Sequence, residues 1–130
     1  MHELAIVQKI VVAANAAAEK HDIRRVKTIR LKLGQMAAAH PKQLAFGFET
    51  YAKGSRLEGA RLEIEELPLV LKCDDCGMRF GDKRMDDHDF AHDIAHAPMT
   101  YLPPPCPSCK GESIRITQGQ EMELVDIEGE

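Results

Sequence analysis

The amino-acid sequence predicts an α/β fold in which two helices pack on a small three-stranded sheet, with a cysteine-containing lobe inserted into the chain. Three observations support this prediction. Helical and strand periodicities alternate before the first cysteine, two identically spaced cysteine pairs follow, and strand periodicity resumes after them. The chain has 130 residues, of which 44% are hydrophobic, so it can bury the core of one compact domain with a small appendage.

Four elements are expected before the cysteines. Apolar residues at helical spacing predict an amphipathic helix over residues 3–20. Apolar residues at every second position then predict a strand that ends at Gly34. A second helix should begin at Pro41, because a proline ring suits the first helical position, and end near Gly54. Renewed alternation around Leu62 predicts another strand.

The residues after the last cysteine predict two more strands. Ile114 and Ile116 alternate with polar residues, and the alternation resumes at Met122 and Leu124. Gly119 lies between the two runs and suits a turn. We therefore expect these strands to form a hairpin.

The charge balance argues against a nucleic-acid-binding protein. The 17 Lys and Arg residues against 21 Asp and Glu residues give a formal net charge of −4, whereas polyanion binders gather a basic excess on one face. The longest apolar run begins at Ile10, is broken by Asn15, and is too short to span a bilayer. No charged-then-apolar leader precedes it. We expect a cytoplasmic protein that binds neither nucleic acid nor membranes.

Two cysteine pairs carry the strongest chemical signal. Two residues separate Cys73 from Cys76, and two separate Cys106 from Cys109. This spacing allows a tight turn to direct both sulfurs at one ion, and two such turns complete a tetrahedral Zn(II) site with Zn–S distances of about 2.3 Å. Gly77 follows the first pair, where such a turn needs a residue that tolerates positive φ. We predict structural zinc at the four cysteines, in a zinc-ribbon-like lobe that needs the ion to fold.

Two other interpretations of the cysteines are weaker. Two disulfides would suit a secreted domain, but the expected compartment favours thiolates on a metal. Redox catalysis by one pair needs a thiolate at the start of a helix in a βαβ unit, and neither pair opens an amphipathic helix. A closed four-thiolate site has no position for water or substrate, and no nucleophile–base pair stands out. We therefore do not expect an enzyme.

Four motifs that occur together point to a family. The chain opens with MHEL at residues 1–4, contains LEGARLEI at residues 57–64, has CPSC as its second cysteine pair, and carries EMEL at residues 121–124. With these motifs the chain resembles the hydrogenase nickel-incorporation proteins of the HypA/HybF family over nearly its whole length. The resemblance implies a nickel metallochaperone for the maturation of nickel–iron hydrogenase, and of urease in some organisms. It also implies two partners, a HypB-type nucleotide-hydrolysing accessory protein and the hydrogenase large subunit.

The resemblance places nickel at Met1, His2 and Glu3. In the family His2 is the essential nickel ligand, and Glu3 helps to hold the coordination or the partner contacts. The chemistry agrees, because a free α-amine, two backbone amide nitrogens and one imidazole can surround an ion in a plane. That set suits Ni(II) or Cu(II) and not tetrahedral Zn(II). Outside this family pattern, a histidine at this position is an ordinary surface residue.

The histidines of the segment 77–105 are a second candidate for metal contact. His88, His92 and His96 recur every four residues, so on a helix they share one face. Two imidazoles one turn apart can chelate one ion, whereas the outer pair is ~12 Å apart at a rise of about 1.5 Å per residue. One of these histidines could complete the nickel site or replace a thiolate at zinc. The alternative is a solvated helix with neutral histidines.

These observations predict a discontinuous architecture. We expect residues 1–70 and 113–130 to form a nickel-binding α/β domain and residues 71–112 to form a zinc-binding domain with the long insert 77–105. The predicted function is that of a nickel metallochaperone with Ni(II) as transient cargo and Zn(II) as a structural ion, in a monomer or homodimer. The alternative is a zinc-ribbon adaptor that binds a protein partner without delivering nickel.

Overall fold

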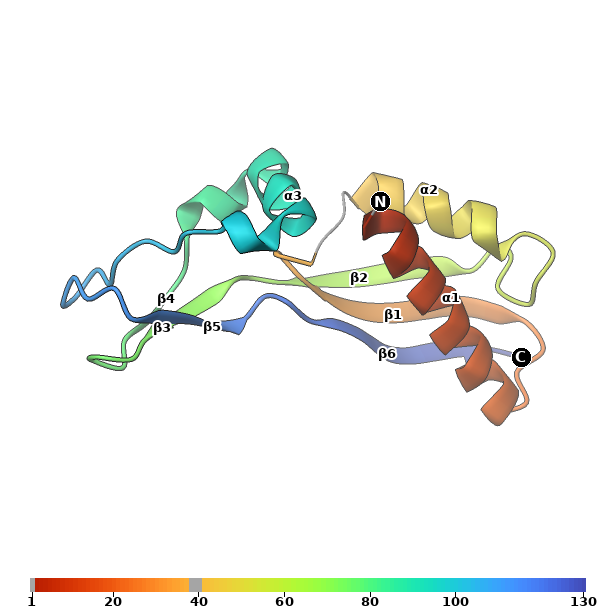
Figure 1. Cartoon of the computed structure of the whole chain (residues 1–130). Helices are drawn as coiled ribbons and strands as arrows, with labels where there is room; N and C mark the ends of the chain where they lie inside the picture. The colour runs from red at the N-terminus through yellow and green to blue at the C-terminus, as the bar shows by residue number, and fades with distance from the viewer. Residues whose placement is uncertain (1, 38–40) are drawn as a thin grey trace. The chain divides into compact units, whose positions relative to one another are not determined.

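The computed structural model describes residues 2–37 and 41–130. Figure 1 shows its helices and strands along the chain. In chain order they are α1 (His2–Lys20), β1 (Val26–Gly34), α2 (Pro41–Ala52), β2 (Arg61–Leu67), β3 (Val70–Cys73), β4 (Arg79–Phe80), the 3-10 helix η1 (Lys83–Asp86), α3 (His88–His96), the 3-10 helix η2 (Pro98–Thr100), β5 (Ile114–Gln118) and β6 (Met122–Gly129). Among the described residues, no helix is long and apolar enough to cross a membrane.

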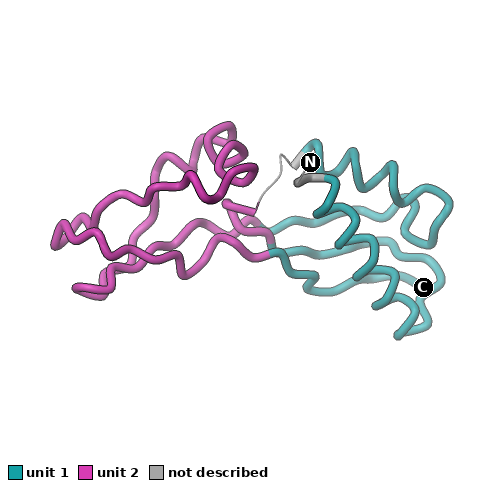
Figure 2. Tube along the Cα trace, viewed as in Figure 1, with its two compact units in different colours: residues 1–32, 39–65, 122–130 teal, residues 33–38, 66–121 magenta. Residues whose placement is uncertain are grey.

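The chain divides into two compact units, coloured separately in Figure 2. Unit 1 comprises residues 1–32, 39–65 and 122–130, and unit 2 comprises residues 33–38 and 66–121. Unit 2 thus contains all of the segment that the sequence assigns to the cysteine lobe, together with the residues that flank it on both sides.

A three-stranded sheet in the order β2-β1-β6 underlies unit 1. The backbone N–H of Val26 donates to Arg56 at one end of the β1–β2 pair and that of Gln35 donates to Leu67 at the other, so these strands run in the same direction. Helix α2 is the connection between them, which makes a strand–helix–strand unit. Strand β6 runs opposite to β1, because Arg25 pairs with Glu130 and Gly34 with Glu121.

The core of unit 1 is aliphatic. Helix α1 packs against α2 and β6, and the Cβ of any residue replacing Gly47 would lie 3.2 Å from Val7, so a small residue lets the two helices approach. Buried side chains recur at helical spacing on α1 and α2 and alternate along β1 from Ile29 onward. The core includes Val7, Ile10, Ala14, Val26, Ile29, Leu31, Leu44, Phe48 and, after α2, Leu57. Two helices on a three-stranded sheet are what the sequence predicted, and this prediction is confirmed.

Unit 2 has its own three-stranded sheet in the order β4-β3-β5. Strand β3 pairs antiparallel with both neighbours, and Leu71 lies opposite Phe80 on one side and Ile116 on the other. A buried cluster packs on this sheet and is formed by Met36, Leu69, Leu71, Met85, Ala91, Ile94 and Tyr101. Helix α3 contributes Ala91 and Ile94 to it, so the histidine-rich segment is a helix with one buried face.

The predicted hairpin between the last two strands is wrong. Strands β5 and β6 both exist, but they belong to different sheets. At Gly119 the chain does not fold back on itself. Its carbonyl accepts from the N–H of Met36, and the carbonyl of Glu121 accepts from the N–H of Gly34. Alternation correctly located the strands, but it carries no information about which strand each one pairs with.

Candidate metal centre

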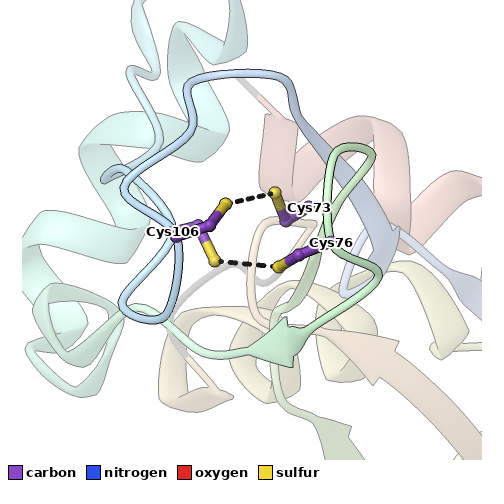
Figure 3. Close-up of side chains that lie close together, drawn as sticks. Cys73, Cys76 and Cys106 are labelled. Carbon is purple, nitrogen blue, oxygen red and sulfur yellow. Dashed lines mark hydrogen bonds between the residues drawn. The ribbon is translucent and has the colours of Figure 1, made fainter.

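The four cysteine sulfurs converge on one point in unit 2. Cys73 ends β3 and is fully buried, and Cys106 is 1% exposed. The Sγ atoms of Cys73 and Cys109 lie 3.6 Å apart, and those of Cys76 and Cys106 lie 3.5 Å apart. All four sulfurs lie within 4.8 Å of one another. Figure 3 shows the two pairs facing each other across the cluster.

Each cysteine pair lies on its own backbone turn, and the two turns have the same hydrogen-bond pattern. The N–H four residues after the first cysteine donates to that cysteine's carbonyl: Gly77 to Cys73 at 2.8 Å and Lys110 to Cys106 at 2.9 Å. The cysteine's own N–H donates to the carbonyl one residue further on, Met78 or Gly111. The two turns are therefore equivalent, position by position, and each presents its sulfurs on one side.

The positive-φ position of this turn is filled differently in the two copies. Gly77 has a φ of 79°, as the sequence suggested, whereas its counterpart is Lys110 with a φ of 61°. Such a conformation is uncommon for a residue with a side chain and marks a position fixed by its surroundings. Gly111 is needed next to it for a different reason, because a Cβ there would lie 2.6 Å from Asp75 and 3.2 Å from the Cys109 sulfur.

The surroundings of the sulfurs shift the pKa values of the thiols in opposite directions. The backbone N–H groups of Cys109 and Ser108 point at the Cys106 sulfur and lower the pKa of that thiol to about 7. The Gly111 N–H acts in the same sense on Cys109, but the neighbouring thiols and burial outweigh it and raise its pKa to about 12. Four thiolates this close together repel one another, so a bound dication is needed to hold all four deprotonated.

The cluster fits zinc. Four sulfurs placed about 2.3 Å from a central ion in a tetrahedron lie about 3.8 Å from one another, close to the observed separations of 3.5 and 3.6 Å. Disulfides need sulfurs about 2.05 Å apart, and all four cysteines are free. A four-thiolate set leaves no coordination position for substrate, so bound zinc would supply folding stability and no chemistry.

The insert histidines lie on α3, as the four-residue spacing predicts. The Nε2 atoms of His92 and His96 are 3.0 Å apart, and their rings meet edge to face with centroids 4.3 Å apart. The described residues contain one group of three or more clustered metal-ligand side chains, and it is the cysteine cluster. His88, His92 and His96 therefore do not converge as a three-histidine site, nor does one of them join the four sulfurs.

The nickel ligands expected at the start of the chain are only partly within the described residues. Met1 lies outside them, and α1 begins at His2. The side chains of His2 and Glu3 also lie outside the described residues. The N-terminal nickel site stays a prediction.

A buried network that sequence reasoning missed connects the two ends of the insert. Asp82 is 8% exposed; its carboxylate accepts from Tyr101 at 2.8 Å and from the Arg84 guanidinium at 2.7 Å. Arg84 also donates to the carbonyl of Leu102. Burial opposes ionisation of Asp82, but these hydrogen bonds outweigh it and lower the pKa of the carboxyl group. No local sequence pattern predicts such a network, because Asp82 and Tyr101 are 19 residues apart in the sequence.

Comparison with known proteins identifies the family. Residues 1–129 match the family model described as "Hydrogenase/urease nickel incorporation, metallochaperone, hypA". The chain is 38% identical over 130 residues to the "Hydrogenase maturation factor HypA" of Roseiflexus sp. (strain RS-1), covering 100% of this chain and 93% of that protein. It is 33% identical over 128 residues to the protein of the same name from Thermomicrobium roseum, covering 98% and 97%.

A solved structure supports the fold independently. The solution structure of the Ni metallochaperone HypA from Helicobacter pylori is 23% identical and superposes with a TM-score of 0.63, covering 99% of this chain and 97% of that one. At this identity the likeness shows a shared fold. The full-length family match, the fold and the four-cysteine cluster agree, and the chain belongs to the HypA family of nickel-incorporation metallochaperones of hydrogenase maturation.

Proposed function

We propose that this member of the HypA family carries Ni(II) at its N-terminus and delivers it to a maturing hydrogenase. The observation that carries the proposal is the family match over residues 1–129, which includes the Met1-His2-Glu3 opening. The α-amine of Met1, the amide nitrogens of residues 2 and 3 and the His2 imidazole form the ligand set, with Glu3 as a further contact. These ligands lose protons on binding, so nickel affinity falls as the solution is acidified.

The second part of the proposal assigns zinc to Cys73, Cys76, Cys106 and Cys109. Two equivalent backbone turns hold the sulfurs at separations that suit a tetrahedral ion. Zinc at this closed site stabilises unit 2 and stays in place while nickel is exchanged. Zinc is thus the structural ion, bound within residues 71–112, and nickel is the transient ion, bound by the domain of residues 1–70 and 113–130.

Transfer by ligand exchange explains why an open terminal site suits a carrier. A planar ion is accessible along its axis, so an incoming thiolate or imidazole can attack there and draw the ion away. The acceptor is the hydrogenase large subunit, or urease where one is present, and the helper is a HypB-type nucleotide-hydrolysing protein. The chain works in the cytoplasm as a monomer or homodimer, and ligand exchange needs no catalytic residue.

Nickel titration of the untagged, zinc-loaded chain tests the proposal. We expect the wild type to develop the visible absorption band of planar nitrogen-coordinated Ni(II), and His2→Ala to abolish it. His21→Ala is the matched control, because His21 is an exposed histidine of the same unit, and it should leave the band unchanged. A wild-type protein without the band, or a His2→Ala protein that keeps it, would contradict nickel delivery from the N-terminus and leave the adaptor alternative.

A further inference from the structure

We infer that His92 and His96 form a second metal site, a two-imidazole chelate on α3 for a dication that prefers right-angled coordination, such as Ni(II) or Cu(II). Their Nε2 atoms lie 3.0 Å apart on successive turns of the helix. The site needs no ligand from the start of the chain. It therefore goes beyond the proposed function and can stand or fall separately from it.

The separation of the two nitrogens selects the kind of ion. Two nitrogens bound about 2.1 Å from one metal lie about 3.0 Å apart when they subtend a right angle and about 3.4 Å apart at the tetrahedral angle. The observed 3.0 Å matches the right angle. Adjacent positions of a square-planar or octahedral ion are at right angles, whereas zinc prefers a tetrahedron. The pair therefore suits nickel better than it suits the ion of the cysteine cluster.

Helix α3 holds the pair in this register before any ion binds. The side chain of Asp87 caps the helix by accepting from the N–H of Asp89, and the N–H of Ala97 closes the last turn. The opposite face is fixed by burial, since Ala91, Ile94 and Ala95 are at most 9% exposed. A rigid helix needs little reorganisation to present two imidazoles to one ion, which lowers the entropic cost of chelation.

The charge of the segment also favours a cation. Four aspartates lie on or immediately before α3: Asp86, Asp87, Asp89 and Asp93. Negative charges on the same short segment lower the electrostatic cost of bringing a dication to the helix. The two imidazoles fill two positions of the ion, and the other positions can be taken by water or by an incoming donor. Such an ion exchanges readily, which fits a staging position for cargo.

The test is calorimetric titration of the full-length, zinc-loaded His2→Ala protein with NiCl₂. We expect one remaining nickel site in this background. Adding His92→Ala or His96→Ala should weaken it at least about tenfold, because each removes one ligand of the chelate. Adding His88→Ala, which changes a histidine on the same helix, should alter the affinity less than about twofold. Zinc content and helix content should be equal in all variants, since these substitutions remove no residue of the buried cluster.

The spin state of the bound nickel separates this site from the N-terminal one. Planar four-nitrogen Ni(II) is diamagnetic, whereas a six-coordinate ion on two imidazoles and waters is paramagnetic. We expect nickel to broaden the imidazole proton resonances of His92 and His96 in the His2→Ala protein. If that protein binds no nickel, or if its nickel is unaffected by His92→Ala and His96→Ala, the 3.0 Å contact is a hydrogen bond between imidazoles and the inference is wrong. Failure of the planar band in the wild type would overturn the proposed function alone.

Discussion

Units 1 and 2 reach stability by different routes. Unit 1 buries an aliphatic layer between two amphipathic helices and a sheet, and its buried core contains no cysteine. Unit 2 has a short sheet, one nine-residue helix and long irregular segments. Its apolar cluster is small, and four thiols stand together at the end of β3. The difference indicates that an ion substitutes for apolar surface where the chain has too little to bury.

The comparison also explains how the histidine helix is placed. Alone, nine residues are too few to form a stable helix in water. Helix α3 persists because Ala91 and Ile94 join the buried cluster and because the Asp82 network ties η1 to the segment after η2. The placement of the α3 histidines therefore depends indirectly on the stability of the zinc lobe.

Removing the metal should produce the largest effect and should affect the two units unequally. We expect chelation of zinc, or Cys73→Ser, to abolish amide-exchange protection in β3, β4 and β5, because four uncompensated thiols cannot hold the two turns together. Protection in α1, α2 and β1 should remain, since the core of unit 1 contains no cysteine. Residue-resolved hydrogen exchange measures both. Restoring zinc to the chelated wild type should recover the protection, and equal loss in both units would refute the comparison.

Truncating the unit 1 core should have the converse effect. Leu44 on α2 is fully buried, so Leu44→Ala should lower the free energy of unfolding of unit 1 by about 2–5 kcal/mol. The four thiols are untouched, so zinc content should stay at one ion per chain. Val12→Ala is the control, because Val12 lies on α1 and is 69% exposed; it should change stability by less than about 0.5 kcal/mol. Zinc loss in Leu44→Ala would show that the units are not energetically separate.

What could be predicted from the sequence follows the same division. In unit 1 every element was foreseen, because helical and alternating periodicities report directly on which face is buried. The cysteine turns were also foreseen, since ligand spacing is a local property. Which strand pairs with which is not a local property, and it was not predicted: β5 pairs with β3, whereas β6 pairs with β1. Between β5 and β6, the carbonyls of Gly119 and Glu121 accept from Met36, just after β1, and from Gly34 at its end, and nothing within either strand specifies these hydrogen bonds.

Two other features escaped prediction for a related reason. Lys110 adopts the left-handed conformation that Gly77 adopts in the first turn, and its residue type does not indicate this, because a lysine rarely takes a positive φ. Asp82 looks like an ordinary charged residue of a loop, and its burial depends on Tyr101 arriving from the far end of the insert. Both depend on contacts with residues distant in the sequence or on the turn as a whole, which no local pattern reports.

The smallest effect is expected for the Asp82 network, and its pH dependence makes it specific. Asp82→Asn should destabilise unit 2 by about 1–3 kcal/mol at neutral pH, because the Arg84 guanidinium and the buried Tyr101 phenol lose their charged acceptor. Tyr101→Phe keeps the ring in the cluster and removes one hydrogen bond, so it should cost less, about 1 kcal/mol.

The sign of the pH effect follows from the lowered pKa of Asp82 in the folded protein. The ionised carboxylate stabilises the fold at pH values above its unfolded pKa, near 4, and this contribution is lost as the pH falls through the lower folded value. The gap in unit 2 stability between wild type and Asp82→Asn should therefore be constant from pH 8 to about 5 and shrink below about pH 4. Zinc content is measured at each pH, and the comparison uses only conditions in which both proteins keep the ion, because acid release of zinc would unfold unit 2 in both. A gap that widens on acidification would mean that the network is not held by the ionised carboxylate.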